Sequence, residues 1–200
     1  WHTLSLHDAL PISRDVSWAP RGHEVAFEQF AMPWRGRRAK AAQIIGRCEL
    51  DRSERRFRVR GESFELAFDR RTGTINEWSA DGRSLLARGP RLNLWRAPTD
   101  NDGIPHKLAE REQVLNRWRT WGLDKLRREV INSSAVRRRS GEVVIRCQIR
   151  AAGRGCDAGV THRCEYTIRP DGTIVADNRF LVDRDLDDLP RLGVGLILPA

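Results

Sequence analysis

The sequence lacks any apolar run approaching the roughly 18 residues that a membrane-spanning helix needs, so no membrane partner is expected. Cysteine is also scarce. Its four copies, Cys48, Cys147, Cys156 and Cys164, show none of the close pairing typical of a zinc ribbon. We interpret them as reduced thiols of a cytoplasmic protein. The spacing of Cys156, His162 and Cys164 has no fourth donor nearby, so no metal site is predicted.

Lysine is nearly absent: only Lys40, Lys107 and Lys125 occur among 36 basic residues, and arginine carries the net charge of +9. A charge of this size indicates a nucleic acid partner when the cations cluster, because clustered cations displace counterions from phosphates. Here the arginines are scattered among aspartates and glutamates, and the dense runs at 35–38 and 137–139 lie at expected turns or linkers. We therefore expect no nucleic acid partner.

Residues 1–13 have neither the basic start nor the unbroken apolar centre of a secretory signal peptide. The stretch is similar to translated sequencing-adapter read-through. We therefore expect it to be non-native and exclude it from the predicted fold.

From Asp15 onward, short alternating segments separated by turn residues predict an all-β protein. Residues 25–30 read as a strand that ends before Pro33, because proline cannot continue a central ladder. The basic, aperiodic stretch 35–47 predicts a linker. The expected organisation is the end of one module over residues 14–34, the linker 35–47, and a second module over residues 48–200.

Turn residues divide the second module into a β-meander followed by further strands. Turns are expected at Asp69–Gly73, Asp81–Gly82 and Pro170–Gly172. The expected extended segments are residues 57–68, 74–78, 84–87, 142–149, 162–168, 173–182 and 192–197. The chain stops inside the last of these, which would leave an open sheet edge, so we expect a truncated domain.

One helix is predicted over residues 108–121. Apolar and aromatic residues recur there at spacings of three, four and seven, and Gly122 is placed to end the helix. We interpret the aromatic stripe, which includes Trp118 and Trp121, as facing the core.

A family resemblance rests on residues 92–103, Leu-Asn-Leu-Trp-Arg-Ala-Pro-Thr-Asp-Asn-Asp-Gly. They resemble the R-A-P-x-D-N-D-G signature in the small-chain domain of the large β-galactosidases of glycoside hydrolase family two. The hairpin at 66–75 and the Trp118-x3-Gly122 spacing are similar to the flanks of that signature. Residues 16–30 resemble the end of the immunoglobulin-like domain that precedes it.

The resemblance implies a fragment: the end of an immunoglobulin-like sandwich, then a truncated β-supersandwich related to galactose mutarotases, with one short helix. The parent would be a cytoplasmic, homo-oligomeric β-galactosidase that hydrolyses terminal β-D-galactosides such as lactose with retention, through two glutamates of a central barrel. That barrel, with the parent's magnesium and sodium sites, lies outside this chain. We therefore expect no catalytic residue, cofactor or metal here, and no activity of the fragment alone; its partners would be the other domains of the same polypeptide.

The candidate site residues are those of the signature: Arg96, Asp100, Asn101, Asp102 and Gly103. Two interpretations stay open. In the structural one, Asp100 and Asn101 cap turns while Arg96 pairs locally. In the functional one, implied by the resemblance, the signature lies near substrate and Gly103 begins a closing loop at the active-site mouth.

Two other functions compete with the enzyme fragment. A stand-alone carbohydrate-binding or aldose-mutarotase-like module would need a histidine acid and a glutamate base in the sheet cleft. His162 is the one histidine on an expected sheet strand, and no partner glutamate can be assigned to it. A basic nucleic-acid-binding module would require an affinity for DNA that falls steeply with salt.

Overall fold

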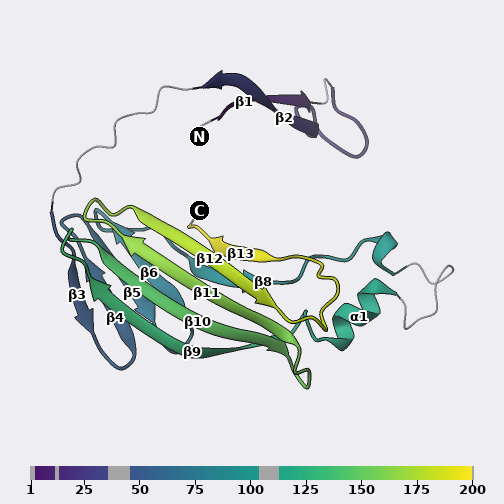
Figure 1. The fold of residues 1–200 in the computed structure, drawn as a ribbon. Helices are drawn as coiled ribbons and strands as arrows, with labels where there is room; N and C mark the ends of the chain where they lie inside the picture. The colour runs from purple at the N-terminus through teal and green to yellow at the C-terminus, as the bar shows by residue number, and fades with distance from the viewer. Residues whose placement is uncertain (1–2, 12–13, 36–45, 104–112, 200) are drawn as a thin grey trace. The chain divides into compact units, whose positions relative to one another are not determined.

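A computed structural model describes residues 3–11, 14–35, 46–103 and 113–199, and the fold is all-β with one α-helix (Figure 1). The chain divides into two units, Trp1–Gln43 and Ile44–Ala200. No helix in the described part of the chain is long and apolar enough to cross a membrane.

The first unit holds an antiparallel pair, β1 (Thr3–Pro11) and β2 (Glu24–Arg35). β1 covers part of the stretch 1–13, whose expected non-native origin stays a prediction. The expected strand end before Pro33 is wrong, because β2 runs through it. Pro33 is tolerated there since the register shifts between the pairs Thr3–Arg35 and Ser5–Ala31, where a ladder hydrogen bond is not required.

Three sheets build the described part of the second unit. A five-stranded sheet, ordered β3-β4-β5-β6-β7, comprises Glu49–Arg52, Arg56–Arg60, Phe64–Asp69, Thr74–Ala80 and Arg83–Ser84. A four-stranded sheet, ordered β12-β11-β10-β9, comprises Ile174–Val182, Gly159–Ile168, Val143–Gly153 and Leu126–Arg137. The third sheet pairs β8 (Arg88–Asn93) with β13 (Gly193–Ile197). The expected linker 35–47 falls largely on residues outside the described part.

Two hydrophobic clusters share the inner faces of β10 and β11. The larger cluster packs β4, β5 and β6 against them and includes the fully buried Leu66, Phe68, Ile145 and Ile168. The smaller cluster packs the end of β8 and the helix α1 (Val114–Thr120) against the opposite end of the same strands, through Leu94, Trp118, Ala151 and Val160 among others. The result is a sandwich-type fold in which α1 covers one end of the four-stranded sheet (Figure 1).

The expected turns form where glycine or aspartate supplies a left-handed backbone. Asp81 and Gly82 have φ of 48° and 74°, which suits the two-residue turn between β6 and β7. Gly73 and Gly172, with φ of 69° and 83°, sit at the other two predicted turns. The expected extended stretch 57–68 is a hairpin, because the chain turns at Gly61, whose N–H donates to the Phe64 carbonyl at 3.0 Å.

The helix ends as expected but its start differs. Gly122 adopts φ of 66°, and the Leu123 N–H donates to the Trp118 carbonyl at 3.0 Å, which closes the helix with a left-handed cap. The helix begins at Val114, because Gln113 before it is extended. The predicted start at residue 108 falls among residues 104–112, which lie outside the described part. Trp118 is buried and faces the core, as predicted.

Candidate functional site

The signature is held in place by the strand before it and the helix after it. β8 delivers the chain to Leu94, which is buried, and Trp95 packs edge-on against Trp118 with ring centroids 6.3 Å apart. The chain then forms a single 3₁₀ turn at Asp100–Asp102. Residues 96–103 are thereby fixed beside α1.

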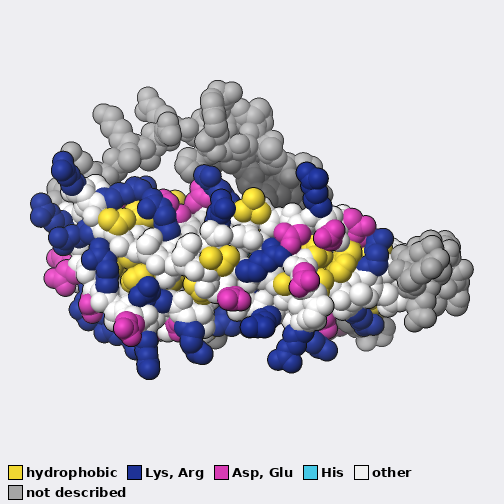
Figure 2. Space-filling model, turned by 60° about the horizontal axis from the view of Figure 1, so that its bottom comes forward, with side chains coloured by type: hydrophobic (Ala, Val, Ile, Leu, Met, Phe, Trp, Pro, Cys, Tyr) yellow, Lys and Arg dark blue, Asp and Glu magenta, His cyan; other side chains and the backbone are white. Residues whose placement is uncertain are grey.

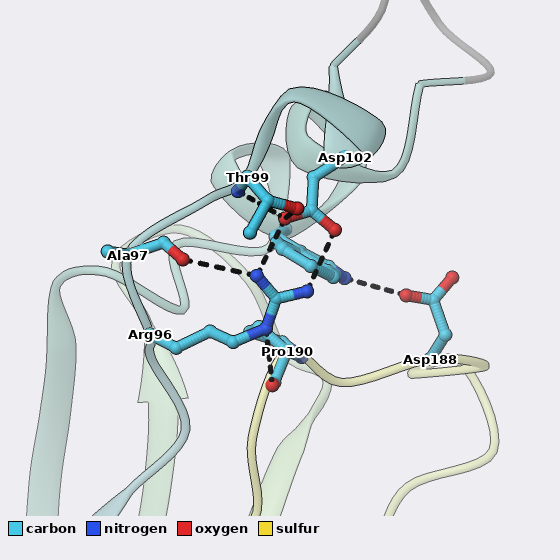
Figure 3. A network of polar contacts seen from close by, with 7 residues as sticks. Arg96, Ala97, Thr99, Asp102, Asp188 and Pro190 are labelled. Atoms are coloured by element: carbon cyan, nitrogen blue, oxygen red, sulfur yellow. Dashed lines mark hydrogen bonds and ion pairs between the residues drawn. The ribbon is translucent and has the colours of Figure 1, made fainter. Parts of the chain in front are cut away.

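Asp102 closes this turn with its side chain. One carboxylate oxygen, Oδ2, accepts hydrogen bonds from the Thr99 backbone N–H at 2.7 Å and from the Thr99 hydroxyl at 3.0 Å (Figure 3). The Asp102 N–H donates back to the Thr99 carbonyl at 3.0 Å. The turn is therefore capped by Asp102, and the expectation that Asp100 and Asn101 would cap it is wrong. Both of those side chains are exposed.

Arg96 pairs with Asp102 through two parallel hydrogen bonds. Nη1 donates to Oδ2 at 2.6 Å and Nη2 donates to Oδ1 at 2.8 Å, which is the fork geometry that makes arginine–carboxylate pairs strong (Figure 3). The Asp102 side chain is only 11% exposed. The local pairing expected of Arg96 is observed, with Asp102 as its partner.

The same guanidinium reaches two further parts of the chain. Its Nε donates to the Pro190 carbonyl at 3.1 Å, and its carbon Cζ lies 5.1 Å from the centre of the Trp118 ring. The Trp118 indole N–H in turn donates to Asp188 at 2.6 Å, and Arg117 also pairs with Asp188. We call Arg96, Thr99, Asp102, Trp118 and Asp188 the clamp.

The electrostatics of the clamp follow from these contacts. The hydrogen bonds from Arg96, and then from the Thr99 N–H, hold the pKa of Asp102 well below its usual range. The pairing with Asp102 raises the pKa of Arg96. Asp102 therefore stabilises the fold while it is ionised, and this contribution is lost only as the pH falls below the usual aspartate range. A carboxylate held ionised in this way is a poor proton donor at neutral pH, and both of its oxygens already accept hydrogen bonds from Arg96 or Thr99.

Sequence reasoning did not identify the partners Asp188 and Pro190. They belong to the turn after β12, about ninety residues from Arg96 in the sequence. The four-stranded sheet places the end of β12, and therefore this turn, beside the clamp. The acidic run 183–188 is the sequence feature that could have indicated an acidic partner. Asp183 anchors the start of this turn, since it pairs with Arg150 of β10 and accepts the Gly159 N–H at 3.0 Å.

Other candidate residues do not assemble into a reactive centre. His162 is buried, with its Nε2 2.8 Å from the Asn178 side-chain oxygen and its ring stacked on Phe180. Burial lowers its pKa, and none of its described contacts is with a carboxylate, so the acid–base pair of a mutarotase-like enzyme is not formed around it. Among the described residues, no three His, Cys, Asp or Glu side chains lie close enough to hold a metal ion.

The arginines do not form a binding stripe on the face seen in Figure 2, where basic and acidic side chains are interspersed. Several are paired directly with acids, including Arg58 with Glu65 at 3.2 Å and Arg146 with Glu165 at 2.6 Å. Cationic groups neutralised in this way release few counterions from a nucleic acid. The hypothesis of a nucleic acid partner is therefore weakened.

Comparison with known proteins decides the family. Residues 60–200 match the family described as "Beta galactosidase small chain". The chain belongs to this family. The family match covers the clamp, the smaller hydrophobic cluster, most of the larger one and all but the first strands of the second unit.

Curated relatives extend the similarity to the first unit. The chain is 30% identical over 192 residues to "Beta-galactosidase" of Priestia megaterium, covering 96% of this chain and 17% of the relative. It is 28% identical over 209 residues to that of Psychromonas ingrahamii, and 28% identical over 203 residues to that of Vibrio cholerae. The chain spans 17% to 19% of the length of these relatives.

Proposed function

We propose that this chain is one part of a β-galactosidase that hydrolyses terminal non-reducing β-D-galactosides, such as lactose, with retention. The family match supports the galactosidase assignment, and the relatives' greater length supports a parent with further domains. The observation that carries the local role is the clamp: Arg96 and Asp102 fix the backbone of residues 96–103 on α1. In this proposal the chain supplies structure next to the active site, while the reacting groups belong to other domains of the same polypeptide.

The contacts of Asp102 favour a supporting role for the signature. A retaining glycosidase needs two carboxyl groups about 5 Å apart, one of them able to donate a proton. Asp102 is held ionised by Arg96, and Asp100 is exposed beside it. The magnesium, sodium and homo-oligomeric assembly of the parent also belong to this proposal. No step assigned to this chain passes through a metal, since its described side chains offer no donor set.

The remaining domains have a surface on which to pack. Exposed large apolar side chains of the second unit are concentrated on the last two strands and their ends: Val175, Leu181, Val182, Leu192, Leu196, Ile197 and Leu198. β12 is an edge of the four-stranded sheet, and β13 has β8 as its partner. In the proposal, further chain of the parent pairs with these strands and covers them.

The experiment that tests the proposal compares this chain with the reading frame extended at its source locus in both directions. We expect the extended product to hydrolyse o-nitrophenyl β-galactoside and the 200-residue chain to leave it intact. Hydrolysis by the short chain would overturn the supporting role. An extended product with no galactosidase activity, or a frame bracketed by a start and a stop at these residues, would favour a stand-alone carbohydrate-binding module.

The clamp gives a prediction for the extended enzyme. Asp102→Asn replaces one charged acceptor by an amide, so Arg96 loses its fork partner and the turn loosens. We expect kcat/KM to fall about tenfold to a hundredfold, the scale of a displacement near 1 Å at a site that positions substrate. The matched control is Asp100→Asn, which changes an exposed carboxylate two residues away and should leave kcat/KM unchanged. Equal effects of the two substitutions would show that the clamp does not position the site.

A further inference from the structure

A cavity lies on the four-stranded sheet, away from the clamp. It has a volume of about 350 Å³ and crosses β9, β10, β11 and β12. Cys147 and Cys164, which face the core, contribute to its floor. Its remaining lining residues are polar: Asn132, Arg146, Gln148, Arg163, Glu165, Asp177 and Arg179.

The strand register aligns these polar side chains in two rows. Gln148 is opposite both Asn132 and Arg163, and Arg163 is opposite Arg179, so one row runs amide, amide, guanidinium, guanidinium across the sheet. Residues directly opposite in antiparallel strands have Cβ atoms about 5 Å apart on the same face. Side chains that are neighbours in this row can therefore contact the same small ligand. The neighbouring row, Arg146, Glu165 and Asp177, follows the same register.

Some charged side chains of this cavity have an ion-pair partner and others do not. Glu165 pairs with Arg146 at 2.6 Å, and Asp177 lies 3.5 Å from Arg179. Arg163 has no ion pair within the described part of the chain, and it stands directly opposite a second guanidinium. Like charges in directly opposed cross-strand positions destabilise a sheet, and Asp177 offsets only the Arg179 charge, so an anion beside Arg163 would relieve the remaining repulsion.

The chemistry of the lining selects the kind of ligand. A neutral sugar is commonly held by stacking on an aromatic ring, and no aromatic side chain is among the described residues that line the cavity. Guanidinium groups match the geometry of carboxylates and phosphates, to which they donate two parallel hydrogen bonds. We propose that this cavity binds a small oxyanion, a carboxylate or a phosphate group, through Arg163 and Arg179, with the amide of Gln148, the neighbour of Arg163 in the row, as an additional donor. This inference does not rest on the proposed galactosidase function.

The test is a titration of the ¹⁵N-labelled 200-residue chain with inorganic phosphate, galacturonate and galactose. At least one of the two anions should shift the amide resonances of β10, β11 and β12, with a dissociation constant on the order of 1 mM, and neutral galactose should not. Shifts from phosphate alone would identify a phosphate site, and shifts from galacturonate alone a carboxylate site. Absence of shifts with both anions, or equal shifts with galactose, would overturn the proposal.

Variants separate this site from general charge attraction. Arg163→Gln should weaken anion binding at least tenfold, and Arg179→Gln should do the same independently. The control is Arg83→Gln, which removes the same charge from the exposed strand β7 and should leave the affinity unchanged. Equal weakening by all three substitutions would overturn the proposal. Unfolding midpoints of the variants show whether each is folded. Arg163→Lys keeps the positive charge but loses the two parallel N–H donors of the guanidinium, so it should bind the anion with intermediate affinity.

Discussion

Trp118→Ala is expected to lower the free energy of unfolding of the second unit by about 3 to 5 kcal/mol, the usual cost of deleting a large aromatic side chain from a core. Trp118 is 3% exposed and packs among Leu94, Leu123 and the other members of the smaller cluster. Its removal also leaves Asp188 without the indole donor and Arg96 without the ring beneath it. For a unit of this size, each kcal/mol corresponds to about 2 to 4 °C in the unfolding midpoint.

Urea or thermal denaturation of the 200-residue chain measures this effect, and two further variants interpret it. Trp118→Phe keeps an aromatic ring in the core but removes the N–H that donates to Asp188, so its cost should be lower, about 1.5 to 3 kcal/mol, that of one hydrogen bond to a charged group. Trp18→Ala, at a tryptophan that is 68% exposed in the first unit, should be close to neutral. If Trp118→Ala cost no more than Trp18→Ala, the smaller cluster would not be a core of this fold.

The sequence predicted best where a local pattern determines the structure. Asp81–Gly82, Gly122 and Gly172 were assigned to turns or a helix end because their residue types tolerate left-handed backbone, and each adopts it. The alternating stretch 57–68 was expected to be extended, and its apolar residues Phe64, Leu66 and Phe68 lie on β5 and are buried in the larger cluster. These features depend on neighbours in sequence, which a single chain displays.

Strand β9 was missed because its pattern is weak. Residues 126–137 carry several charges, and the strand pairs with β10 alone, so most of its side chains are exposed. A register shift opposite Gln148 and Ile149 adds Ile131 as an extra residue, which breaks the period-two alternation. A register shift in the pairing of β1 with β2 likewise accommodates Pro33 inside β2.

The signature motif includes Arg96 and Asp102, which the structure joins in the clamp, and its role as a site stays a prediction. The roles within it were assigned by proximity along the chain, which favoured Asp100 and Asn101 as turn caps. Asp102 closes the turn because a side chain three residues after Thr99 can reach back to the Thr99 N–H. The contact of Asp188 with Trp118 depends on the pairing of β11 with β12, which no local pattern encodes.

Gly153→Ala is expected to displace the end of α1 from β10 and to cost at least about 1 to 3 kcal/mol, the range for overpacking a filled core. A Cβ atom at Gly153 would lie 2.0 Å from the Trp121 carbonyl oxygen and 2.7 Å from the Gly122 Cα. Both are backbone atoms, so no side chain can rotate away, and the helix end or the strand must move. Trp118 lies on this helix, so the displacement should reach the clamp.

The indole N–H resonance of Trp118 reports that displacement separately from stability, because its proton is shared with Asp188 at 2.6 Å. In Gly153→Ala the resonance should move towards the position of a solvent-exposed indole, together with a lower unfolding midpoint. Gly193→Ala is the matched control, since a Cβ there meets nothing within 4 Å and the substitution should change neither quantity. A lower unfolding midpoint with an unchanged Trp118 resonance would mean that β8 and the turn at 183–190 hold the clamp in place without the contact between α1 and β10.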